Sequence, residues 1–309
     1  MFAYLVRRLL VAIPTLFVII TLAFFMMRAA PGSPFDLERP MPERIRERIE
    51  ASFHLDKPIY VQYGYYLRGL AKGDLGPSMK YKDKDVADLI REGLPISATI
   101  GASSMLLAML VGGILGSIAA LRQNSGVDYA VMGFSTTGIS IPTFVTGPIM
   151  ALVFGVYLHW LPTGGLDRGH MTFQNMIMPV ITLALPQIAI ISRLTRASMI
   201  EVLRSNFIRT AYAKGLSPRA VLFGHALRAA VLPLVSYAGP ATAALLTGTL
   251  VVEQIFALPG IGRQFTIGAL QRDYTVVMGV VILYAALIIV FNLLADLIYG
   301  LLDPKVRYR

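Results

Sequence analysis

The sequence contains no cysteine and only four histidines among its 309 residues. The absence of cysteine excludes disulfides and thiolate metal sites. Charged residues make up 15% of the chain, whereas an ordinary soluble domain carries about a quarter. Hydrophobic residues make up 55%, more than a soluble protein of this length could bury, so we expect the bilayer to be its solvent. The histidines are too scattered to predict a metal site: His54, His159, His170 and His225.

The sequence also lacks an energy source of its own. No G-x-x-x-x-G-K-[ST] phosphate loop occurs, so we expect no ATP hydrolysis by this chain, and no nucleophile–base pair predicts an enzyme. Secondary transporters usually carry ionisable residues near the membrane midplane. Here Arg28 and Asp296 lie toward the ends of apolar stretches, where snorkelling or pairing explains them. A pump driven by another subunit is favoured, and a secondary transporter or a non-transporting channel or scaffold stays as an alternative.

Six apolar stretches predict an all-α integral membrane protein. Each can reach the length of a membrane helix, although the fourth is short, and the alternation of barrel strands is absent. The first stretch is longer than the apolar region of a signal peptide, so we expect an uncleaved span. The stretches are residues 9–27, 96–121, 131–160, 176–191, 231–252 and 276–302.

The distribution of Lys and Arg predicts the orientation. The net charge is +10, and the basic residues sit beside apolar runs rather than in a domain that would bind nucleic acid. Residues 31–95 hold 11 basic and 11 acidic residues, and long neutral loops cross membranes readily. We therefore expect this loop outside, and both termini and the 191–228 loop in the cytoplasm. The cytoplasmic segments then hold Arg7, Arg8, Arg122, Arg193, Arg196, Arg204, Arg209, Lys214, Arg219, Arg228, Lys305, Arg307 and Arg309.

The outer loop is predicted to be structured. Pro42 and Glu43 open a charged helical stretch. An aromatic cluster follows, which favours a belt in the headgroup region, with a docking surface for a soluble partner as the alternative. Its members are Tyr60, Tyr63, Tyr65 and Tyr66.

Small residues and prolines mark the other spans. Gly112 and Gly116 form a G-x-x-x-G pattern that predicts close helix packing. Prolines interrupt later stretches, which suits helices that bend around a path. Three threonines of the fifth stretch could line that path or bond back to their own helix, and both alternatives stay open. The prolines are Pro142, Pro148, Pro179, Pro186 and Pro240, and the threonines are Thr242, Thr247 and Thr249.

The cytoplasmic segment 193–233 predicts a helix, a sharp turn and a second short helix. Lys214 and Gly215 end the first helix, since glycine adopts the left-handed cap and a cation suits the C-terminal dipole. Ser217 and Pro218 then start the next one. We expect this elbow to seat in a groove of a partner. A basic anchor on anionic lipid is the simpler alternative.

This stretch resembles the EAA loop of ABC importer permeases. Arg209, Thr210 and Ala211 stand at the E-A-A positions and Gly215 at the glycine. Arg209 replaces the Glu, and Arg228 stands where the general pattern has Pro. Both departures fit the peptide-permease branch, which reads R-T-A-x-A-K-G-L. The resemblance assigns ATPase coupling to Arg209, Thr210, Ala211, Tyr212, Ala213, Lys214, Gly215, Leu216, Ser217 and Pro218.

Further motifs resemble the same branch in order along the whole chain. They are FFMMRAAPGSPF (24–35), YGYYLRGLAKGDLGPSMKYKDKDV (63–86), VVEQIFALPGIGRQF (251–265) and LLDPKVRY (301–308). The likeness is to the OppB-type permeases of oligopeptide importers, with dipeptide permeases next. It implies a type I ABC importer permease fold in one domain over 1–309, with an outer insertion at 31–95 and a coupling loop at 192–230.

The resemblance also implies partners in a bacterial inner membrane. These are a second, OppC-type permease, two cytoplasmic ATPases (OppD- and OppF-type) that hold ATP and Mg, and an OppA-type periplasmic binding protein. No cofactor is expected on this chain. Peptide is the expected cargo, and nickel or glutathione is the alternative within the family. The turn after the fifth span, with Glu253, Pro259 and Gly260, is expected to gate the path, to contact the binding protein or only to reverse the chain.

Overall fold

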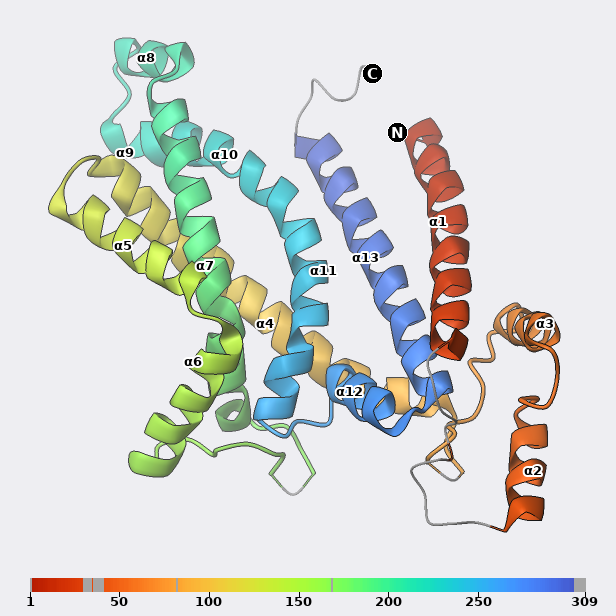
Figure 1. The fold of residues 1–309 in the computed structure, drawn as a ribbon. Coiled ribbons are helices and arrows are strands. Elements are labelled where there is room, and N and C mark those ends of the chain that lie inside the picture. Colours follow the sequence, from red (N-terminus) through yellow and green to blue (C-terminus); the bar gives the residue numbers. More distant parts are fainter. Residues whose placement is uncertain (1, 30–34, 36–41, 82, 168, 303–309) are drawn as a thin grey trace.

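The computed structural model describes residues 2–29, 35, 42–81, 83–167 and 169–302, and most of them lie in helices (Figure 1). Long helices run through the body, and short helices cap its two ends. The helices are α1 (Phe2–Ala29), α2 (Glu43–Ser52), α3 (Ile59–Leu70), α4 (Val86–Leu121), α5 (Gly126–Ser140), α6 (Thr143–Met150), the π-helical η1 (Ala151–Tyr157), α7 (Phe173–Leu203), α8 (Asn206–Ala213), α9 (Pro218–Val221), the π-helical η2 (Leu222–Ala226), α10 (Leu227–Ala230), α11 (Leu232–Ile255), α12 (Ile261–Gln271) and α13 (Tyr274–Leu302).

The membrane-crossing helices agree with the six predicted stretches. Within the described residues, α1, α4, α7 and α13 contain the four unbroken helices that are long and apolar enough to span. Two bent pairs, α5 with α6–η1 and α9–α10 with α11, would raise the number to six if each pair counts as one span. The all-α membrane architecture predicted from the apolar stretches is confirmed.

The third predicted stretch is not one straight helix. Its two halves, 126–140 and 143–157, meet at an angle of 100°. Pro142 cannot donate a backbone hydrogen bond, and it disfavours helical geometry at the preceding residue. Ile141 accordingly has extended geometry, with φ −91° and ψ 116°. By contrast, α7 runs through Pro179 and Pro186 without a break and continues 12 residues beyond the predicted end at 191.

The core lies where α4, α7 and α11 meet. Buried side chains from all three helices form it, among them Ile100, Met178 and Val252. The predicted close packing at the glycine pair is confirmed, because a Cβ at Gly112 would lie 2.9 Å from the Ile188 carbonyl oxygen of α7. A Cβ at Gly116 would collide with the Ser192 carbonyl oxygen one turn further along.

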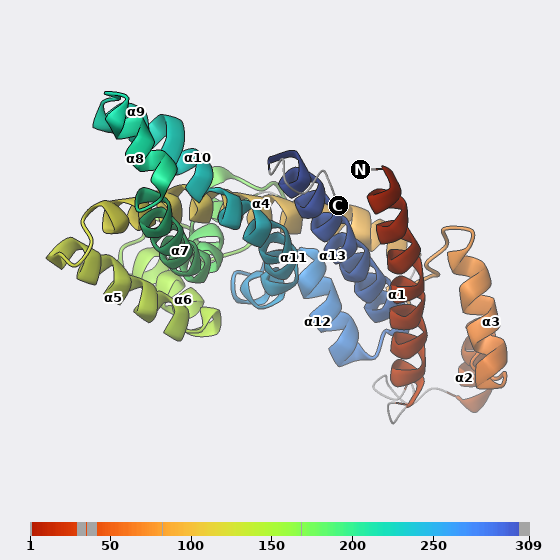
Figure 2. The ribbon, with the colours of Figure 1, turned by 90° about the horizontal axis from the view of Figure 1, so that it is seen from above.

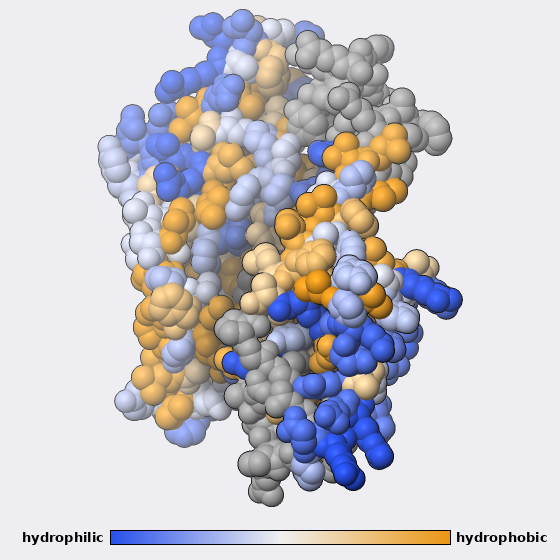
Figure 3. All heavy atoms as spheres, turned by 45° about the vertical axis from the view of Figure 1, so that its right-hand side comes forward, coloured by the Kyte–Doolittle hydropathy of each residue, from blue (hydrophilic) through white to orange (hydrophobic). Residues whose placement is uncertain are grey.

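The two ends of the bundle carry different structures. The elbow of α8 and α9 lies at the same end as the start of α1 and the end of α13 (Figure 1). The helices α2, α3 and α12 lie toward the opposite end, and α2 and α3 sit outside α1 when the molecule is seen from above (Figure 2). Apolar surface covers the middle of the molecule, while hydrophilic surface gathers over the outer loop and near the elbow (Figure 3).

Candidate functional site

The elbow has the turn that its sequence predicts. Gly215 has φ +79°, and its N–H donates to Tyr212 O at 2.9 Å, while Leu216 N–H donates to Ala211 O at 3.3 Å. This pair of bonds is the Schellman arrangement, which satisfies carbonyls at a helix end. Ser217 Oγ then accepts from Ala220 N at 3.3 Å and caps α9. The predicted helix end and helix start are both confirmed.

A buried apolar cluster fixes the elbow to the spans. Ile208 and Ala211 of α8 are buried against Met199 of α7 and Val221 of α9. Ala120, at the end of α4, belongs to the same cluster. A hydrogen bond of 3.1 Å from Ser198 Oγ of α7 to Ala230 O of α10 connects the two helices at the base of the elbow. Displacement of the elbow would therefore be carried into α4, α7 and α10.

The outward surface of the elbow combines apolar and basic side chains. Among the residues predicted to couple, only Ala211 is buried, and the other nine are exposed. Large apolar side chains are exposed here, with exposed fractions of 49% for Phe207, 47% for Tyr212 and 70% for Phe223. Exposed apolar side chains among charged ones are typical of protein-binding surfaces.

An ion pair that no sequence pattern predicts stabilises the same end of the bundle. Asp128 of α5 is buried and receives two hydrogen bonds of 2.6 Å from Arg196, one from Nε and one from Nη2. The Asn124 backbone N–H donates to the same carboxylate at 2.9 Å. No local pattern links the two residues, because 68 positions separate them and only the packing of α5 on α7 brings them together.

At the opposite end, Glu253 anchors the outer turn from inside. Its carboxylate is fully buried, accepting from Ser97 Oγ of α4 at 2.6 Å and from the Arg263 backbone N–H at 3.0 Å. Ser97 Oγ in turn accepts from Ile261 N–H at 2.9 Å. The N-terminus of α12 is thus held by a carboxylate from α11 and a hydroxyl from α4, which suits the helix dipole. Gly260 is required beside it, because a Cβ there would collide with the Glu253 carboxylate.

The remaining path candidates are tied to their own helix. Thr242 Oγ1 donates to Ala238 O at 2.7 Å, and the fully buried Thr249 Oγ1 donates to Leu246 O at 2.7 Å. Both hydroxyls therefore bond back to their own helix, and whether they also line the path stays a prediction. The side chain of Thr247 lies outside the described part of the structure. Pro259 is partly exposed in the turn before α12.

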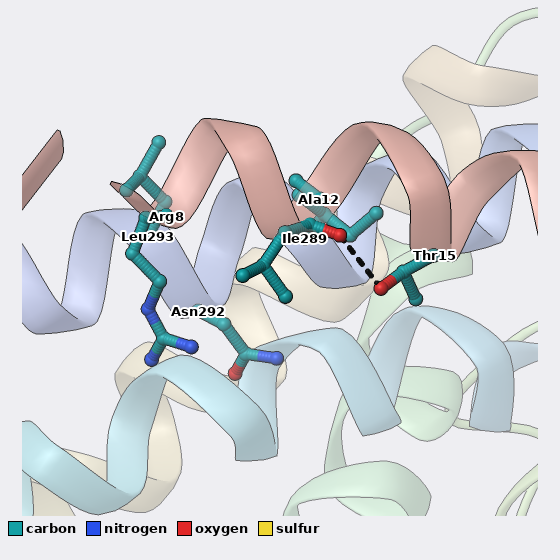
Figure 4. A pocket seen from close by; sticks show the side chains of 7 residues that line it. Arg8, Ala12, Thr15, Ile289, Asn292 and Leu293 are labelled. Atoms are coloured by element: carbon teal, nitrogen blue, oxygen red, sulfur yellow. Dashed lines mark hydrogen bonds between the residues drawn. The ribbon is translucent and has the colours of Figure 1, made fainter. Parts of the chain in front are cut away.

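A small cavity separates α1 from α13 near the elbow end of the bundle (Figure 4). Its volume is about 160 Å³, and Arg8, Thr15 and Asn292 line it together with apolar side chains. Arg8 forms an ion pair with Asp296, so the predicted pairing of Asp296 is confirmed. This ion pair links α1 to α13 at the end of the bundle that the distribution of Lys and Arg predicts to be cytoplasmic.

The outer loop is tied to the start of α13. Asp273 is buried and accepts from Ser78 Oγ and, at 3.2 Å, from Lys80 N–H. It also caps α13 by accepting from Val276 N–H at 3.1 Å. Residues 78–80 are therefore fixed on the bundle, which confirms that the outer loop is structured. The four tyrosines predicted to form one aromatic cluster lie in two different environments. Tyr63 and Tyr66 pack on Phe24 of α1, while Tyr60 and Tyr65 are exposed.

Comparisons with known proteins cover the whole chain. Residues 112–308 match the family described as binding-protein-dependent transport system inner membrane component, and residues 1–99 match its N-terminal family. The chain is 53% identical to the oligopeptide transport system permease protein OppB of Salmonella typhimurium, covering 100% of both chains. It is 41% identical to the dipeptide transport system permease protein DppB of Bacillus subtilis, covering 98% of this chain and 97% of that one.

One solved structure shares the fold. It is the MetNI methionine ABC transporter in an inward-facing conformation, with a TM-score of 0.59 and 18% sequence identity. The match covers 70% of this chain and 96% of that chain.

Proposed function

The chain belongs to the binding-protein-dependent transport system inner membrane components, and from this membership we propose that it imports peptides as one permease subunit of an ATP-driven transporter. The family's members are non-catalytic, multi-pass subunits of the inner membrane. Peptide cargo is supported by relatives named for oligopeptide and dipeptide transport at 53% and 41% identity. The chain would form half of the path and a second, OppC-type permease the other half.

The exposed elbow is the observation that carries the proposal. Its apolar side chains Phe207, Tyr212 and Phe223 have nothing to cover them within the described residues, and basic residues surround them. They would seat in grooves of OppD- and OppF-type ATPases, which would bind ATP and Mg²⁺ in the cytoplasm. Both termini of the chain would lie on this side, as the clustering of Lys and Arg predicts.

Coupling would follow from the rigid base of the elbow. Closure of the ATPases would shift α8 and α9, and the buried cluster around Met199 and Ile208 would pass the shift to α7. A 43° bend between α10 and α11 connects the same base to the helix that ends at Glu253. The outer turn and α12 would then move with α11, opening the path alternately to each side as a rigid-body switch. An OppA-type binding protein would deliver the peptide outside.

The contact with the ATPases can be tested by photo-crosslinking in the assembled transporter. The chain has no cysteine, so Arg219→Cys on the exposed elbow gives it a single thiol. A thiol-attached benzophenone at this position is expected to crosslink an ATPase subunit. Lys72→Cys, exposed on the outer loop, is the matched control and is expected to give no ATPase adduct.

The same two variants test the orientation. A membrane-impermeant maleimide is expected to label Lys72→Cys in intact cells and Arg219→Cys only after the membrane is opened. Labelling of Arg219→Cys from outside, or an ATPase adduct with Lys72→Cys in place of Arg219→Cys, would overturn the proposed coupling role.

A further inference from the structure

A polar cavity lies at the outer end of α1, away from the path and the elbow. Its volume is about 260 Å³, and it is bounded by the last turn of α1, the end of α2, helix α3 and residues 74–79. Four of the polar side chains on its wall come from three segments: Arg28 from α1, Gln62 and Tyr66 from α3, and Asp74 from the segment that follows α3. None of these residues takes part in the coupling or gating proposed above.

Three buried polar atoms on the wall have no hydrogen-bond partner among the residues that the structure describes. They are Arg28 Nε, Gln62 Oε1 and Tyr66 Oη. Buried polar groups are normally paired, so several unpaired ones around one cavity are available to bind a ligand. Arg28 also forms no ion pair with a described carboxylate, and its guanidinium is held over the rings of Phe24 at 5.3 Å and Tyr274 at 5.6 Å.

The wall offers donors and acceptors in a fixed arrangement. Gln62 Nε2 donates to Lys57 O at 2.7 Å and to Leu55 O at 3.3 Å, so the amide is oriented and its oxygen remains as an acceptor. Asp74 adds a carboxylate at the rim, where one oxygen accepts from Gly76 N–H at 2.8 Å. Burial raises the pKa of the Tyr66 phenol, so this hydroxyl stays protonated and can donate.

The cavity lies beside the end of a candidate membrane span, where lipid headgroups are expected. Arg28 is in the last turn of α1, which contains a membrane span that ends at Ala29. Helix α3 packs beside this end, with Tyr63 Oη and Thr21 Oγ1 2.6 Å apart. Tyr60 of α3 is 71% exposed and Tyr65 is 48% exposed, as is typical of a helix in the aromatic belt of a bilayer.

We propose that this cavity binds the zwitterionic headgroup of an outer-leaflet phospholipid, with the chemistry of phosphoethanolamine. The phosphate is held by the Arg28 guanidinium and the Tyr66 hydroxyl, which are both donors. The primary ammonium is held by Gln62 Oε1 and the Asp74 carboxylate, which are both acceptors. A soluble peptide also pairs an anion with an ammonium, but the position of Arg28 at the end of a span favours the lipid.

A thermal titration of the purified, fully assembled transporter in detergent tests the site. The probes are dihexanoyl phosphatidylethanolamine, dihexanoyl phosphatidylglycerol and dialanine. We expect phosphatidylethanolamine to raise the unfolding midpoint saturably and the other two probes to have much weaker effects. Equal protection by phosphatidylglycerol would overturn the ammonium contacts, protection by dialanine alone would assign the cavity to peptide, and no protection by any probe would refute the site.

Variants of the lining residues test whether stabilisation by phosphatidylethanolamine arises at this cavity. Arg28→Gln and Tyr66→Phe are each expected to raise the half-saturating phosphatidylethanolamine concentration about tenfold or more, because each removes a donor to a charged group. Arg91→Gln removes an exposed outer arginine that pairs with Asp88, and it is expected to leave the titration unchanged. If Arg28→Gln does not assemble, Tyr66→Phe decides, since it deletes a single oxygen. An unchanged titration with Tyr66→Phe would refute the proposal.

Discussion

Ser97 donates a hydrogen bond of 2.6 Å to the carboxylate of Glu253, which lies 156 positions further along the chain. Both side chains are buried, and together they hold the backbone N–H groups of Ile261 and Arg263 at the start of α12. One carboxylate and one hydroxyl therefore join three helices, α4, α11 and α12. The position of α12 depends on this junction, since no cap within its own sequence serves it.

Ser97→Ala should loosen the outer turn. The substitution leaves one Glu253 oxygen and the Ile261 N–H without their buried partner, which costs about 1–3 kcal/mol. We expect a lower unfolding midpoint of the purified transporter and slower peptide uptake. Thr99→Ala on the same helix is the control, because Thr99 is exposed and bonds only to the Pro95 carbonyl. Equal effects of the two substitutions would contradict the role of the junction.

Arg196→Lys tests the ion pair between α5 and α7. Lysine keeps the charge but cannot donate from two fixed nitrogens, as Arg196 Nε and Nη2 do toward Asp128. We expect a loss of about 1–3 kcal/mol of stability, measured by denaturant or thermal unfolding. Asp128→Asn should cost more, about 3–5 kcal/mol, since it leaves a largely buried guanidinium unpaired. Arg193→Lys, at an exposed site on the same helix, should be silent.

Gly116→Ala tests the contact between α4 and α7. The added methyl group would collide with the Ser192 carbonyl oxygen and the Thr195 side chain, so the helices must separate. Overpacking of this kind costs about 1–3 kcal/mol, and we expect less folded protein in the membrane and a lower unfolding midpoint. Gly113→Ala faces open space and should be neutral or slightly stabilising. The prediction fails if both variants behave alike.

Leu216→Glu places a charge on the elbow without disturbing its fold, since Leu216 is 38% exposed. We expect peptide uptake to be abolished, while the binding protein keeps its affinity for peptide and the transporter still assembles in the membrane. Normal uptake by this variant would show that the elbow is not the coupling surface.

Substitutions at Gly215 test whether uptake requires the left-handed backbone conformation of the turn. At φ +79°, a side chain with a branched Cβ costs about 1–2 kcal/mol, whereas asparagine tolerates this conformation. We therefore expect uptake to fall with Gly215→Val and to persist with Gly215→Asn. Equal uptake by the two variants would contradict the requirement for a left-handed turn.

Local patterns fixed much of this protein without its tertiary structure. Glycine at 215 and the Ser217–Pro218 pair determine the elbow, because helix ends depend on backbone geometry and caps within a few residues. The apolar stretches determine the spans, since a bilayer requires about 20 apolar residues in a helix. The small residues Gly112 and Gly116 indicate a contact surface, although not its partner helix.

Only the tertiary structure decided which distant groups meet. Asp128 meets Arg196 only because α5 packs on α7, and Glu253 meets Ser97 only because α4 packs beside α11. The sequence favoured bends at several prolines, but only the structure shows that the chain bends by 100° at Pro142 while Pro179 and Pro186 occur within a continuous helix. A proline removes one backbone bond, but the surrounding packing decides whether the helix breaks there. Contacts across hundreds of positions depend on the arrangement of whole helices, and no local pattern carries that information.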